Sequence, residues 1–127
     1  VHAPCYYLHL ERGRVFAGAG IWHPDAAALV ALRRAVATRG AEWKKALSGA
    51  AFKRGCALEG DSLKRPPRGF DPDHPLIEDL KPKDFIAATH WTEADVLAPD
   101  LLNRMARFCR TTAPLTRFLA KALKLQW

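Results

Sequence analysis

Near its start the chain alternates side chains between two faces, as β-strands do, over residues 5–10 and again over residues 15–22. Gly13 lies between these ranges and can adopt the positive φ of a tight turn, so we expect an antiparallel hairpin. The alternation assigns the first strand's side chains to opposite faces, with Tyr6, Leu8 and Leu10 on one and Cys5, Tyr7 and His9 on the other. The small run Ala17-Gly18-Ala19-Gly20 in the second strand predicts the close approach of a packed helix or, alternatively, of a ligand.

Further along the chain, apolar side chains recur at helical spacing. Leu29, Leu32 and Val36 define a helix that we expect to begin after Asp25 and to end at Gly40. The other predicted elements are a helix at 42–47, a strand at 55–59, a short helix at 74–80, a strand at 85–91, a short helix opened by a Thr92–Asp95 capping box and a last helix from Asp100. Pro114 predicts a break or kink in that last helix, with Thr111 or Thr112 capping the second part.

These strands and helices do not alternate strictly, which favours an α+β fold with a mainly antiparallel or mixed sheet of about four strands and helices packed on it. The length fits a single domain over residues 1–127. Hydrophobic residues make up 49% of the chain, enough for a packed core, and this excludes disorder of the low-hydrophobicity kind. No apolar run approaches the roughly 20 residues that cross a bilayer, so we expect no membrane association.

The formal net charge is +7, which is typical of proteins that bind an anionic small molecule or nucleic acid. Basic residues spread over solvated helix faces would give the same total, because the chain contains no long basic block. The cysteines Cys5, Cys56 and Cys109 lie far apart and form neither a zinc nor a disulfide framework. Their pattern favours a reducing, cytoplasmic location, and we expect no metal and no cofactor.

The most distinctive stretch is a proline-rich loop in which Lys64, Arg65 and Arg68 flank Pro66-Pro67. Prolines stiffen a loop, so these cations can stay close together with little loss of conformational entropy. Guanidinium groups bind phosphate or carboxylate through paired hydrogen bonds, which makes the three residues a candidate anion site, with Arg33 as a further contact. The alternative is a solvated loop in which the cations pair with the nearby carboxylates Asp61, Asp71 and Asp73.

The same loop suggests a second hypothesis, a hydrolase-like or metal-assisted enzyme. Its polar centre would consist of Asp61, Asp71, Asp73 and His74. The signal is weak because this spacing matches no established set of metal ligands, and Asp and Pro are also common turn formers. The sequence contains no nucleophile elbow around Ser48 or Ser62, no phosphate-binding glycine loop and no dinucleotide fingerprint.

Two further interpretations involve the predicted strands. His9 and His90 could be neighbours across the sheet, although strand histidines more often have a packing role. Aromatic residues interleaved with basic ones, as in sheets that stack nucleic-acid bases, are not evident within any single strand. Whether the chain is an enzyme is therefore left open, and a structural or protein-interaction domain is a third alternative.

Several runs together resemble a known family. They are Tyr7-Leu8-His9-Leu10, Gly18-Ala19-Gly20-Ile21-Trp22 and, most specifically, Leu63-Lys64-Arg65-Pro66-Pro67-Arg68-Gly69-Phe70. They resemble domain of unknown function 2461 (DUF2461), a family of conserved hypothetical proteins common in bacteria. The resemblance implies no established activity and hence no catalytic residues. It also implies that this chain is the C-terminal portion of a longer family domain, whose missing N-terminal segment would be a partner of the Lys64–Arg68 loop.

Overall fold

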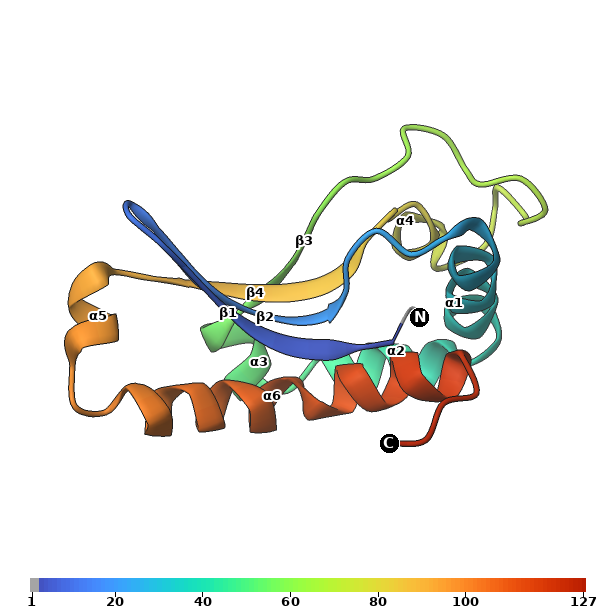
Figure 1. Ribbon diagram of the computed structural model, residues 1–127. Helices are drawn as coiled ribbons and strands as arrows, with labels where there is room; N and C mark the ends of the chain where they lie inside the picture. The colour runs from blue at the N-terminus through green and yellow to red at the C-terminus, as the bar shows by residue number, and fades with distance from the viewer. Residues whose placement is uncertain (1–2) are drawn as a thin grey trace.

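The computed structural model describes residues 3–127 and shows a four-stranded antiparallel sheet with helices packed against it (Figure 1). The strand order is β1-β2-β4-β3, with strands β1 (Cys5–Glu11), β2 (Arg14–Ile21), β3 (Ala57–Glu59) and β4 (Phe85–Trp91). The helices are α1 (Ala26–Thr38), α2 (Gly40–Leu47), α3 (Ala50–Gly55), α4 (Ile77–Leu80), α5 (Glu93–Leu97) and α6 (Leu101–Ala122). The predicted α+β class and the predicted hairpin are confirmed.

The helices cover the sheet unevenly. Figure 1 shows α2, α3 and the long α6 beneath the sheet, α1 and α4 at one end and α5 at the other. In the same view, no helix of residues 3–127 lies over the upper face of the sheet. We call this upper face the open face and the lower one the helix face.

Small residues in β2 allow α6 to approach the helix face. Ala17 and Ala19 are fully buried and belong to a cluster with Phe108 of α6. The predicted helix contact with the small run is therefore confirmed. Gly20 has a φ of +133°, and a Cβ at this position would collide with the carbonyl oxygen of Phe85. Close packing thus depends on the absence of a side chain at this point.

Local sequence signals correctly predicted where two helices begin. The carboxylate of Asp25 accepts a hydrogen bond from the backbone N–H of Ala28 at 2.8 Å and caps α1, and the predicted Thr92–Asp95 capping box is formed at α5. The prediction for Gly40 was wrong: α1 ends at Thr38, and Gly40 is the first residue of α2. A Cβ on Gly40 would lie 2.7 Å from Cδ1 of Leu76, so glycine is favoured here by packing.

The predicted break at Pro114 was also wrong, because α6 runs without interruption from Leu101 to Ala122. Thr112 does not cap a second helix; its hydroxyl donates to the carbonyl of Phe108 at 2.8 Å within the same helix. Helix α3 was not predicted. Two predicted elements are shorter in the structure: the strand expected at 55–59 is confined to β3, and the short helix expected at 74–80 is confined to α4.

Among the described helices, none has the length and apolar character needed to span a membrane.

Candidate functional site

The loop that carries the predicted anion site, residues 60–76, is held in place at its root by a buried carboxylate. We call this segment the basic loop. Asp84 is 4% exposed and accepts hydrogen bonds from the backbone N–H groups of His23 at 2.8 Å and Asp61 at 3.0 Å. The Nδ1 atom of His23 lies 3.4 Å from the same carboxylate. Asp84 thus ties the end of β2, the start of β4 and the basic loop together.

Arg33 also supports the root of the basic loop. It is buried, and its Nη2 donates to the carbonyl of Pro82 at 3.0 Å and that of Lys81 at 3.5 Å. The Lys81 carbonyl also accepts the backbone N–H of Leu63 at 2.8 Å. Desolvation by this burial lowers the pKa of the Arg33 guanidinium. Arg33 therefore bonds to the backbone at the root of the loop and does not lie among the exposed loop cations.

The loop cations Lys64, Arg65 and Arg68 are all exposed. Within residues 3–127, none of them forms an ion pair or a side-chain hydrogen bond. The alternative in which these cations pair with neighbouring carboxylates is therefore not what the structure shows. The predicted cations are left available for a ligand.

The predicted polar centre is not gathered around a cavity. Asp61, Asp71 and Asp73 are exposed, and a carboxylate oxygen of Asp71 accepts the backbone N–H of Asp73 at 2.9 Å in a local turn. His74 uses both ring nitrogens: Nδ1 accepts the N–H of Leu76 at 3.0 Å, and Nε2 lies 3.2 Å from the carbonyl of Ala37. In the described part of the chain, no group of three or more acidic, histidine or cysteine side chains is arranged to hold a metal ion. The geometry gives this centre no support.

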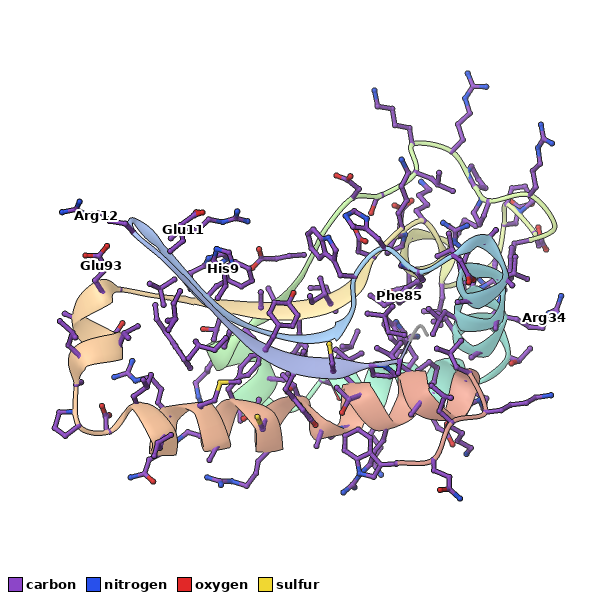
Figure 2. The ribbon with its side chains drawn as sticks, in the orientation of Figure 1. His9, Glu11, Arg12, Arg34, Phe85 and Glu93 are labelled. Atoms are coloured by element: carbon purple, nitrogen blue, oxygen red, sulfur yellow. The ribbon has the colours of Figure 1, made fainter. Side chains whose placement is uncertain are left out.

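A row of rings lies on the open face, and the sequence predicted it only in part. His9 and His90 were expected as possible neighbours across the sheet, but β2 lies between their strands, so Phe16 separates the two rings. His9, Phe16 and His90 occupy directly opposed positions on β1, β2 and β4, so their rings form one row across three strands. His9 stacks on Phe16 with ring centroids 4.7 Å apart, and Phe16 lies 5.8 Å from His90. Figure 2 shows His9 on the upper side of the sheet, away from α6. Tyr7 adds a fourth ring, edge-on to Phe16 at 5.9 Å.

Charged groups surround this row of rings. The guanidinium of Arg14 lies over Phe16, 5.2 Å from the ring centroid. Nε2 of His90 and a carboxylate oxygen of Glu59 are 2.7 Å apart. Burial, with smaller contributions from the negative charge of Cys5, Glu59 and Asp84, raises the pKa of Tyr7 above its ordinary value of 10.

These side chains enclose a small hollow of about 60 Å³, whose polar lining includes Tyr7, Arg14, Trp22, Glu59 and His90. Trp22 follows β2 directly and precedes His23, which bonds to Asp84 at the loop root. The hollow therefore lies next to the root of the basic loop. We treat the open face and the basic loop as one candidate site.

A second basic cavity lies on the helix face, between α3, α6 and β4. This arginine groove has a volume of about 450 Å³ and is lined in part by Arg54, Arg104, Arg107 and Trp91. Arg104 lies 3.3 Å from a carboxylate oxygen of Asp95 and covers the Trp91 ring at 5.8 Å. Within residues 3–127, Arg54 and Arg107 form no ion pair. The groove is thus a competing location for an anion, and sequence reasoning missed it because its arginines come from two different helices.

Comparison with known proteins places the chain in a family but gives it no function. The family model described as "Conserved hypothetical protein (DUF2461)" matches residues 1–118. This extent gives no support to the prediction that the chain is only the C-terminal portion of the family domain and lacks an N-terminal segment. No curated protein and no solved structure matches the chain. Because the family match covers nearly the whole sequence, this protein belongs to the DUF2461 family of conserved hypothetical proteins.

Proposed function

We propose that this protein is a binding module for a phosphate-bearing or otherwise anionic ligand, and that Lys64, Arg65 and Arg68 make the principal contacts. The observation that carries the proposal is that these three cations lack partners in the described structure while the loop beneath them is fixed. A fixed loop loses little conformational entropy when a ligand binds, so more of the interaction free energy appears as affinity.

The basic loop is held at both of its ends. At one end, the backbone N–H of Asp61 bonds to Asp84 and its carbonyl accepts the N–H of Lys83 at 2.7 Å. At the other, His74 lies against the carbonyl of Ala37 and bonds to Leu76. Pro67, between the cations, is buried. These contacts limit the positions that the loop cations can take.

Three like charges without a counter-charge create a positive potential in the solvent above the loop. At physiological ionic strength this potential extends over roughly one Debye length, about 8 Å. An anion that binds two or more of the cations would relieve their mutual repulsion, and arginine adds paired hydrogen bonds to phosphate oxygens. In this proposal Arg33 supports the site through its bonds to Pro82 and Lys81.

The test uses tripolyphosphate as the probe, with binding measured by calorimetry over a range of salt concentrations. The loop variant is Lys64→Ala/Arg65→Ala/Arg68→Ala. The control, Arg54→Ala/Arg107→Ala/Arg110→Ala, removes the same number of exposed arginine or lysine charges from α3 and α6. All six side chains are exposed, so both variants should fold.

We expect the wild-type affinity to fall steeply as salt rises, because salt screens the attraction between the loop cations and the phosphate groups. The loop variant should bind at least about tenfold more weakly, since each charge-assisted hydrogen bond contributes about 1.5–3 kcal/mol. The control should stay within about threefold of wild type, since distant surface charges act only through a screened field. Binding lost in the control but kept in the loop variant would instead assign the anion to the arginine groove, and binding independent of salt would contradict the proposal.

A further inference from the structure

We propose that the anionic ligand is single-stranded nucleic acid, bound across the open face, with the exposed rings of Trp22 and His90 as stacking surfaces and the basic loop as a phosphate contact. This inference rests on the proposed function and names its ligand class. The sheet supplies what such ligands need, which is aromatic faces for the bases next to cations for the backbone.

The row of rings is continuous and is fixed by the strand register. His9 pairs with Phe16 across β1 and β2, and Phe16 pairs with His90 across β2 and β4. Neighbouring strands are about 4.8 Å apart, so the row spans roughly 10 Å of the open face. Within the row, the rings of His9 and Phe16 already stack on each other and Arg14 covers Phe16, so the rings open to a base are those of His90 and Trp22. Stacking on these rings tolerates every base, because every base has a π-face.

Two side chains of this face remain strongly accessible. The side chain of His90 is 60% exposed, and Trp22 is 50% exposed. Trp22 stands edge-on to the ring of His23, with centroids 4.9 Å apart. A large, half-exposed indole that lines the hollow beside a fixed basic loop is well placed to stack on a base.

Cations lie near both ends of the strands that form the open face. Arg12 lies at the tip of the β1–β2 hairpin, where Figure 2 shows its side chain extending into solvent, and Arg14 follows the turn and covers Phe16. The basic loop rises above the sheet toward the other end (Figure 1). A nucleic-acid strand that runs from the hairpin to the loop would therefore meet basic side chains at both of its ends.

Carboxylates also lie near the open face and its hairpin. Glu59 lies 2.7 Å from Nε2 of His90, Asp84 is buried under two backbone N–H donors, Glu11 lies 3.8 Å from Nε2 of His9, and Glu93 accepts the backbone N–H of Gly13 at 2.8 Å. These contacts hold the carboxylates in place but leave their negative charge. The cations without any partner in the described structure are those of the basic loop, so the loop is where we expect the phosphate groups to bind.

The experiment measures the fluorescence anisotropy of a labelled oligouridylate of about ten nucleotides, a length within the range that such surfaces bind. A duplex of the same length and tripolyphosphate serve as comparison ligands. The ring variant is Trp22→Ala/His90→Gln, in which Gln retains a donor for Glu59. Trp127→Ala is the matched control, because Trp127 is 59% exposed and packs against Tyr6 and Arg117, away from the row of rings.

We expect the single strand to bind more tightly than the duplex, whose bases are already stacked inside the helix. The ring variant should bind the single strand about 5- to 150-fold more weakly for each stacking contact that is lost. It should bind tripolyphosphate with the same affinity as wild type. Trp127→Ala should bind like wild type. If the double variant fails to fold by circular dichroism, Trp22→Ala alone carries the same expectation.

Two results separate the failure of this inference from the failure of the proposed function. If the ring variant binds the oligonucleotide like wild type, or the duplex binds as tightly as the single strand, the nucleic-acid inference is overturned. Tripolyphosphate binding that depends on Lys64, Arg65 and Arg68 would then still support anion binding. If tripolyphosphate does not bind, or binds the loop variant as well as wild type, the proposed function itself is overturned.

Discussion

The two faces of the sheet consist of alternate residues of the same strands, yet they differ in almost every property. On the helix face, Ala17, Ala19 and Ile21 are at most 2% exposed, and the small side chains of Ala17 and Ala19 let α6 lie close to β2. On the open face, the intervening positions include Phe16, whose ring is bordered by imidazoles and covered by a guanidinium. One face is built for helix packing, and the other keeps rings and charges that a core would not need.

The tryptophans show the same difference. Trp43 is 1% exposed and lies within the core, where its indole N–H donates to Asp79 at 3.2 Å. Trp22 is half exposed beside the basic loop and has no side-chain hydrogen bond in the described structure. A buried indole with a partner indicates a packing role, whereas an exposed one next to unpaired cations indicates a role in binding.

The largest expected effect comes from adding a side chain to Gly20, which lies in tight contact with β4. Gly20→Ala places a Cβ against the Phe85 carbonyl at a φ of +133°, so we expect a loss of about 3–5 kcal/mol in unfolding free energy. Gly13→Ala is the control, because its φ is +77° but no atom lies within 4 Å of the added Cβ. It should lose only about 1 kcal/mol. If the two variants lose the same unfolding free energy, measured in urea, packing at Gly20 is not the cause of its loss.

The next largest effect should come from the carboxylate that joins the open face to the basic loop. Asp84→Ala leaves the N–H groups of His23 and Asp61 without their acceptor, so we expect about 2–4 kcal/mol less stability and a weaker affinity for tripolyphosphate. Asp71→Ala, at an exposed carboxylate of the loop, should change stability by no more than about 0.5–1 kcal/mol. Unchanged tripolyphosphate binding in Asp84→Ala would show that the anchor does not organise the loop cations.

The smallest effect lies away from both faces, at the start of α5. Hydrogen bonds from the backbone and the side chain of Thr92, followed by the charge of Arg104, lower the pKa of Asp95 below its ordinary value of 3.8. A carboxyl with a lowered pKa in the folded state adds stability above its ordinary pKa and loses it as the pH falls through the folded value. Asp95→Asn should therefore melt slightly below wild type at pH 7, and the gap should close below about pH 4. A gap that does not change with pH would contradict this.

Local signals explain what the sequence predicted well. Alternation at period two gave the hairpin, and Asp25 and Thr92 marked helix starts through contacts within three residues of themselves. The break predicted at Pro114 was wrong because a proline inside a helix costs about 3 kcal/mol, a penalty that tertiary packing can offset. Leu115 and Leu119, which follow it in α6, are fully buried.

The candidate site was only partly predictable for a related reason. The cations of the basic loop are neighbours in sequence and were identified directly. The row of rings depends on strand pairings that join position 9 to 16 and 16 to 90, and no single strand displays the pattern. The supporting role of Arg33 also depends on a contact with Pro82, far away in sequence, so it was predicted as a ligand contact.

The central claim is that the open face and its basic loop form the binding surface, and the indole N–H resonances of the tryptophans test it most directly. Trp22 reports on the open face, Trp43 on the core, Trp91 on the arginine groove and Trp127 on the C-terminal end. We predict that titration with a single-stranded oligonucleotide shifts the Trp22 resonance and leaves those of Trp43 and Trp91 in place. A shift of Trp91 with Trp22 unchanged would place the ligand in the arginine groove and contradict the account.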